Sequence, residues 1–178
     1  LGVAGSLVAD IGSSPLAAGL GWIAVCLFFL ARPRLREQIR VAGVQAQRPL
    51  CVSILPTFKA LFFTLLLSAT APAVLGFAGW RLVSFVGPDF ARSIGFGAQI
   101  SALVYLAIEI FRQTLRPEGL AIIHFGWSEK SLPDLRRNLT WLLALTVPVL
   151  LVYTALQWYL GENYQESFGR LLFIANMI

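Results

Sequence analysis

Charged residues are scarce in this chain, and this scarcity is the first limit on what the chain can be. Only 13% of its 178 residues are charged, while 57% are hydrophobic. Soluble domains average about 25% charged residues, and the mean hydropathy of this chain is +0.74. The composition therefore argues against a water-soluble core and favours a protein whose surface meets lipid.

Histidine and cysteine are nearly absent as well, with one His and two Cys in the chain. The sequence has no GxxxxGK[ST], no HExxH and no CxxC pattern, which excludes the usual signatures of nucleotide and metal chemistry. Two separated cysteines provide neither a His/Cys metal site nor a disulfide framework. No apolar stretch contains a pair of carboxylates. We therefore expect no enzyme, no metal and no cofactor.

The chain is rich in long uncharged runs, at 11–31, 60–80, 93–108 and 138–161. A bilayer core needs about 20 apolar residues as helix, because backbone groups in hydrocarbon must form their hydrogen bonds internally. The runs predict an all-α fold, a polytopic transmembrane helix bundle. Shorter amphipathic or apolar segments at 32–50 and 119–127 predict short interfacial helices.

We expect a single transmembrane domain over 1–178. Its four complete spans lie at about 11–31, 57–81, 90–112 and 138–160. Residues 168–178 start another apolar run. We expect this run to begin a fifth span, so the chain is predicted to be a fragment of a longer protein.

Positive charge is distributed unevenly between the apolar runs. Of the 14 Lys and Arg, all but Arg81, Arg92 and Arg170 lie in two connections, 32–59 and 112–137. Cytoplasmic loops retain such cations, so the pattern places these connections inside the cell and the N-terminus of the chain outside. A pI near 9.8 does not indicate nucleic-acid binding here, because the cations flank apolar spans and form no soluble basic face.

Side chains at the ends of the spans are candidates for contact with lipid headgroups. A cation near the membrane surface attracts anionic lipid by about 1 kcal/mol, and Trp is enriched at the interface. The candidates are Arg32, Arg36, Arg40, Trp80, Arg116, His124, Trp127, Arg136, Arg137 and Trp141. For His124, a polar residue on an interfacial element is the favoured interpretation, and a pH switch is the alternative.

Three residues inside the spans have structural and functional interpretations. Pro72 and Pro148 should bend their helices, as simple kinks or as hinges. Glu109 is the only acid within a span, which makes it a functional candidate. Arg112 follows it by one turn, and this spacing favours an ion pair that snorkels to the interface.

The third span carries small residues one turn apart, and this pattern predicts a face that packs on a neighbouring helix. The pairs are Ala91 and Gly95, Gly97 and Ser101, and Ala98 and Ala102.

Three segments together resemble a family signature. They are Arg116-Pro117-Glu118-Gly119-Leu120-Ala121, His124-Phe125-Gly126-Trp127 and Leu135-Arg136-Arg137-Asn138-Leu139-Thr140-Trp141. They are similar to the inner-membrane domain of large MscS-superfamily mechanosensitive channels of the MscK (KefA) type. The resemblance implies a homo-oligomeric, heptameric channel in a bacterial inner membrane that opens under tension and releases solutes during osmotic downshock. It also implies that the pore-lining helix lies outside this chain.

The function hypothesis is a peripheral, non-pore module that couples bilayer tension to gating, with membrane lipids as partners. Three alternatives stay open. A secondary transporter would need polar or discontinuous helices at mid-membrane. An integral-membrane enzyme would need clustered polar groups at one interface, and a structural scaffold would have no sensing role.

Overall fold

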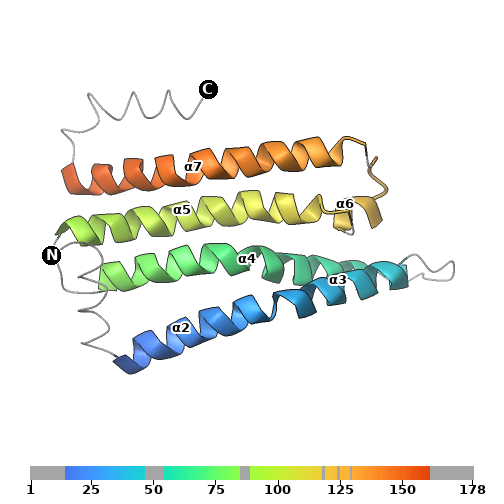
Figure 1. The fold of residues 1–178 in the computed structure, drawn as a ribbon, viewed down its shortest axis with the longest axis horizontal. Helices are drawn as coiled ribbons and strands as arrows, with labels where there is room; N and C mark the ends of the chain where they lie inside the picture. Colours follow the sequence, from blue (N-terminus) through green and yellow to red (C-terminus); the bar gives the residue numbers. More distant parts are fainter. Residues whose placement is uncertain are drawn as a thin grey trace. The chain divides into compact units, whose positions relative to one another are not determined.

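The computed structural model describes residues 15–46, 54–84, 89–117, 119–123, 125–128 and 130–160. Within these ranges the chain forms six helices and no strand, which confirms the all-α prediction. The helices are α2 (Pro15–Leu30), α3 (Arg32–Ala46), α4 (Leu55–Ser84), α5 (Asp89–Thr114), α6 (Leu120–Ile123) and α7 (Leu132–Leu160) (Figure 1).

Three of the described helices, α4, α5 and α7, are long and apolar enough to cross a membrane. The pair α2 and α3 meets the same test only when taken together, with a bend of 42° between them. Helical hydrogen bonding continues across this bend, because the N–H of Leu35 donates to the carbonyl of Ala31 at 3.0 Å. A polytopic bundle is therefore confirmed with three spans, or four if the bent pair is one span. The predicted start of a fifth span, 168–178, lies outside the described residues.

Prolines account for several of the helix boundaries. Pro33, Pro56 and Pro133 are each the second residue of a helix, in α3, α4 and α7. In the first turn a proline removes no intrahelical hydrogen bond, and its fixed φ favours helix initiation. Pro72 and Pro148 lie inside α4 and α7 instead, where each removes a donor from the helix.

The chain divides into two compact units. Unit 1 is built from Leu1–Cys26, Pro72–Tyr105 and Ala144–Ile178, and unit 2 from Leu27–Ala71 and Leu106–Leu143. The helices α2, α4, α5 and α7 contribute residues to both units, and on α4 the division falls directly before Pro72. Contacts inside each unit show which faces of these helices are covered.

In unit 1, α4 and α5 approach so closely that two glycines face each other. A Cβ at Gly79 would lie 2.7 Å from the carbonyl oxygen of Gly95, and a Cβ at Gly95 would lie 2.8 Å from that of Gly79. Ala98 also contacts this point, and Ala102 lies opposite Gly76. The predicted small-residue face of the third span is therefore confirmed for Gly95, Ala98 and Ala102. Close backbone approach of this kind is how helices associate in membranes.

Glycines also allow α5 to approach α7, and α2 to approach α4, within unit 1. A Cβ at Gly97 of α5 would lie 2.7 Å from the carbonyl oxygen of Leu151 on α7. Gly21 of α2 is covered by the ring of Phe77 on α4, which also meets Trp22 edge-on with ring centroids 5.1 Å apart. Small residues thus bring α2, α5 and α7 close to their neighbours.

Aromatic pairs join α5 and α7 near the start of α5. The rings of Phe96 and Trp158 stack, with centroids 4.3 Å apart and an interplanar angle of 13°. Phe90 and Tyr159 form a second, edge-on pair with centroids 5.6 Å apart.

Unit 2 is held by small apolar clusters around α6. Ala42 of α3, Ala60 of α4 and Leu120 of α6 form one buried cluster. The other contains Leu115, Ala121 and Leu132, with Ile122 and Leu139 packed against it. This burial fixes the α5–α6 connection and the start of α7 within the unit.

The end of α6 depends on a glycine. Gly126 has a φ of 65°, and its N–H donates to the carbonyl of Ile122 at 3.1 Å. A positive φ at this position is the usual way to close a helix, and only Gly adopts it without strain.

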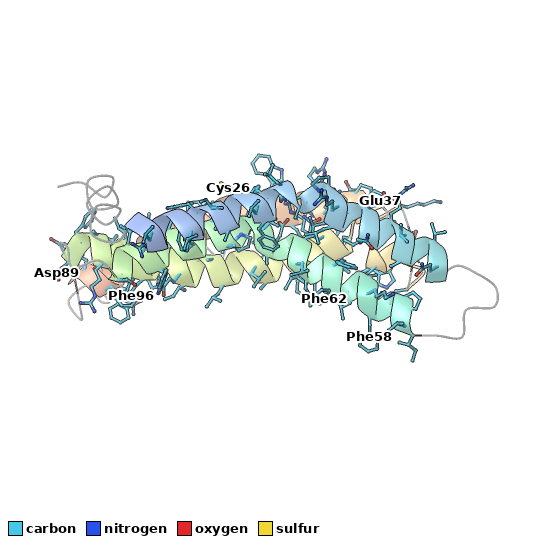
Figure 2. All side chains as sticks on the ribbon, turned by 90° about the horizontal axis from the view of Figure 1, so that it is seen from below. Cys26, Glu37, Phe58, Phe62, Asp89 and Phe96 are labelled. Atoms are coloured by element: carbon cyan, nitrogen blue, oxygen red, sulfur yellow. The ribbon has the colours of Figure 1, made fainter. Side chains whose placement is uncertain are left out.

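Large apolar side chains project outward from unit 2. Figure 2 shows Phe58 and Phe62 on one side of α4, and they are 63% and 58% exposed. A soluble unit rarely exposes apolar surface in this way, so this face is suited to lipid.

Candidate functional site

The most distinctive polar feature of unit 2 is a hollow of about 340 Å³ lined by three arginines. Arg36 comes from α3, Arg116 from the connection between α5 and α6, and Arg136 from the first turns of α7. The other lining residues are Ile39, Gln113, Pro117 and Gly119. We call this the arginine hollow.

A tight turn places Arg116 at the arginine hollow. The N–H of Arg116 donates to the carbonyl of Gln113 at 3.3 Å, and the N–H of Gly119 donates to that of Arg116 at 2.8 Å. A Cβ at Gly119 would lie 2.6 Å from the carbonyl oxygen of Thr114. The backbone is therefore too close at this turn for any other residue.

Beside the arginine hollow, Glu109 is held by two partners on its own helix. Arg112 donates from Nε and Nη2 to the two carboxylate oxygens, at 2.7 and 2.9 Å. Gln113 donates from its amide nitrogen to the same carboxylate. The predicted ion pair is confirmed. Its predicted snorkelling is wrong for Glu109, because that side chain is 1% exposed and the protein itself covers it.

The amide of Gln113 is only half satisfied. Its nitrogen is used by Glu109, whereas its carbonyl oxygen is buried and has no hydrogen-bond partner among the described residues. A buried acceptor without a donor is costly, and this one belongs to a side chain that lines the arginine hollow.

The positive charges of the arginines that line the hollow repel one another. Burial lowers the pKa of Arg116, and the positive charges of Arg36, Arg136 and Arg112 lower it further, while Glu109 acts in the opposite direction. Within the described part of the chain, Arg36, Arg116 and Arg136 form no ion pair with a carboxylate. The arginine hollow therefore concentrates positive charge that Glu109 offsets only in part.

The other predicted interface residues that the structure describes do not line the arginine hollow. Arg40 pairs with Glu37 at 2.7 Å, and Arg137 lies 3.5 Å from Asp134. Arg32 lies over the ring of Phe29, 4.8 Å from its centroid. Trp80, Trp127 and Trp141 are 50%, 54% and 72% exposed. His124 lies outside the described residues.

The described residues contain no group of three or more His, Cys, Asp or Glu that could hold a metal ion. The arrangement they do contain is suited to anions, because guanidinium groups bind phosphate and carboxylate through paired hydrogen bonds.

Residues 15–178 match the family described as mechanosensitive ion channel inner membrane domain 1. The chain belongs to this family. It is therefore a domain of a multi-pass inner-membrane protein of the mechanosensitive channel class, as the resemblance in 116–141 had indicated. The family match does not separate the MscK type from other members.

A curated relative is the miniconductance mechanosensitive channel MscM of Escherichia coli (strain K12), which is 26% identical over 118 residues. The match covers 66% of this chain and 11% of the relative, so the chain spans only a small part of that protein. No solved structure matches the chain.

Proposed function

We propose that this chain is a peripheral, non-pore module that couples bilayer tension to the gating of a mechanosensitive channel. The channel would be a homo-oligomer, a heptamer, that releases solutes during osmotic downshock. The observation that carries the proposal is that a single helix has one face packed on protein and another face left exposed. On α5, Ala98 and Ala102 are buried, whereas Leu103 is 69% exposed and Ile100 is 37% exposed. Small residues meet protein and large apolar residues are left for lipid.

Such a surface can respond to tension if its area in the membrane differs between the closed and open states. A force shifts an equilibrium only through a difference between the two states. Non-pore helices that present apolar faces to lipid are suited to this task, because a tilt or bend changes the area they occupy.

The two prolines within helices are the proposed bending points. Pro72 is buried and directly follows the division between the units on α4, and Pro148 is exposed on α7. Each has a matched control in the first turn of its own helix. Pro56 is buried like Pro72, and Pro133 is exposed like Pro148.

The prolines give a direct test in patch-clamp recordings of the full-length channel. Pro72→Ala restores a helical donor, so it should stiffen α4 and raise the tension at half-maximal opening, and Pro148→Ala should act in the same sense. Pro56→Ala and Pro133→Ala should leave this tension unchanged. If all four variants open at the same tension, bending at Pro72 and Pro148 plays no part in gating.

We further propose that the N-terminus of this chain faces the periplasm. The two connections rich in cations, 32–59 and 112–137, would then be cytoplasmic. This orientation places most of the positive charge in the cytoplasm. The cytoplasmic loops of inner-membrane proteins usually carry such an excess of Lys and Arg.

The alternatives are less well supported. The family and the relative are channels rather than enzymes, and the polar groups of the arginine hollow include no nucleophile or general base in a catalytic pair. A scaffold without a sensing role differs from our proposal in one result only, an unchanged tension dependence when the module is altered.

A further inference from the structure

We propose that the arginine hollow binds the phosphate group of an anionic phospholipid headgroup. This inference goes beyond the proposed function, because binding of a lipid at this place does not require that the module sense tension. It rests on the three arginines that line the hollow, on their mutual repulsion and on the position of the hollow at the ends of two candidate spans.

Three arginines from three different elements line one hollow, and together they can bind an anion that has two free oxygens. Arg36, Arg116 and Arg136 come from α3, the α5–α6 connection and α7. A phosphodiester offers two free oxygens, and arginine pairs with such oxygens in a planar, bidentate arrangement. The volume of about 340 Å³ falls in the range of about 300–1,000 Å³ that is usual for small-molecule sites.

Without an anion this arrangement is unfavourable. Burial and the neighbouring positive charges both lower the pKa of Arg116, although arginine does not lose its proton in proteins. Glu109, the acid near this group, is already engaged by Arg112 and Gln113. A bound phosphate group would reduce the repulsion between the arginines and so stabilise the protein. Arginines with a purely structural role would give no such stabilisation on addition of an anion.

The excess of positive charge in the hollow narrows the chemistry of the headgroup. An ammonium group beside the phosphate would be repelled by the arginines, whereas the glycerol headgroup of phosphatidylglycerol is uncharged. Phosphatidylglycerol therefore supplies the anion without an opposing cation.

The position of the arginine hollow at the ends of two candidate spans favours a lipid over a soluble anion. Gln113 is the second-last residue of α5, and Arg136 is the fifth residue of α7. Both helices are long and apolar enough to cross a membrane. Lipid headgroups lie at the ends of such spans, so a phospholipid can place its phosphate near these residues.

Binding of phosphatidylglycerol to the purified full-length channel, measured by native mass spectrometry, tests the proposal. The double variant Arg36→Gln/Arg136→Gln removes one arginine of α3 and one of α7 from the arginine hollow. The matched control, Arg34→Gln/Arg137→Gln, removes the same charge from the same two helices at exposed positions outside it.

We expect the first double variant to bind phosphatidylglycerol at least about tenfold more weakly, because it loses two charge-assisted contacts. The control should bind within about twofold of the wild type, since Arg34 and Arg137 do not line the arginine hollow. Equal losses in the two variants, or no loss in either, would overturn the proposal.

Thermal unfolding in phosphatidylcholine, without anionic lipid, separates a ligand site from a structural one. The Arg36→Gln/Arg136→Gln variant should be at least as stable as the wild type, because like charges have been removed. Added phosphatidylglycerol should raise the unfolding temperature of the wild type and of the control, but not that of this variant. A variant that is less stable without anionic lipid would overturn the proposal, because the arginines would then be structural.

Inorganic phosphate distinguishes a lipid from a soluble ligand. At millimolar concentration it should stabilise the wild type much less than phosphatidylglycerol does, because it contacts the arginines without acyl chains that hold it in the bilayer. If phosphate alone stabilises the wild type as strongly as the lipid, the assignment to a lipid headgroup is overturned.

Discussion

The guanidinium of Arg112 donates to a carboxylate that the rest of unit 2 buries almost completely, with Nε of Arg112 2.7 Å from Oε2 of Glu109. The Glu109 side chain is 1% exposed. A charge in such a position depends on its partner, because no water replaces the lost contact.

Removal of Arg112 should therefore destabilise the protein strongly. We expect Arg112→Ala to cost about 3–5 kcal/mol, since it leaves a buried carboxylate without its cation. The exposed pair of Arg137 and Asp134, 3.5 Å apart, provides the control, and Arg137→Ala should change stability by about 0–1 kcal/mol. Thermal unfolding of the detergent-solubilised protein measures both. Comparable losses in the two variants would contradict the burial of Glu109.

The glycines between α4 and α5 should not tolerate a methyl group. A Cβ at Gly79 or Gly95 meets the backbone oxygen of the other at 2.7 or 2.8 Å, and overpacking of this kind costs about 1–3 kcal/mol. Gly19 on α2 has nothing within 4 Å of its added Cβ. We expect Gly79→Ala and Gly95→Ala to lower the unfolding temperature and Gly19→Ala to leave it the same or slightly higher. A harmful Gly19→Ala with harmless changes at the other two would contradict the close helix approach.

Gly126 should be replaceable only by a residue that accepts a positive φ. No atom lies within 4 Å of a Cβ added there, so the φ of 65° is the sole obstacle. Gly126→Val should cost about 1–3 kcal/mol through backbone strain, and Gly126→Asn should cost less, because Asn adopts this conformation more readily. Protease sensitivity of the α6–α7 connection and thermal unfolding report the difference. Equal stability of the Val and Asn variants would show that α6 does not need this turn.

The proposed orientation predicts which positions a membrane-impermeant thiol reagent reaches in intact spheroplasts. In a background of Cys26→Ser and Cys51→Ser, Asp89→Cys should react and Arg34→Cys should react only after the membrane is opened. Both native residues are exposed in the structure, so access should depend on the side of the membrane. Labelling of Arg34→Cys in closed spheroplasts would reverse the topology.

The sequence predicted the features of the fold that depend on periodicity and on local stereochemistry. The uncharged runs became helices because a helix satisfies every backbone group without water. The third span showed its packing face because Gly95, Ala98 and Ala102 are small and spaced by about one turn. The ion pair of Glu109 and Arg112 followed from the same spacing on one helix.

The arginine hollow could not be predicted in the same way, because its residues are distant in the sequence. Arg36, Arg116 and Arg136 were candidates individually, but the sequence did not separate them from Arg32, Arg40 and Arg137, which do not line the hollow. Gln113 was missed entirely. Its position one turn after Glu109 was the available signal, and the contact between them is what leaves its carbonyl oxygen without a donor.

The burial of Glu109 is a second feature that the sequence alone could not predict. Spacing indicated the partner of Glu109, but the packing that excludes the carboxylate from the interface is tertiary. The helical nature of the uncharged runs and local pairs are therefore readable from one chain, whereas the depth of a side chain depends on residues far away along it.

The most direct test of the account is the tension at half-maximal opening of the full-length channel with and without residues 15–160. In the proposed orientation this region crosses the membrane four times, an even number, so its removal leaves the orientation of the rest unchanged. Both channels are recorded in excised patches against a second mechanosensitive channel as an internal reference. We predict that the shortened channel still conducts but opens at a clearly different tension. An unchanged midpoint would contradict a role of this module in sensing tension.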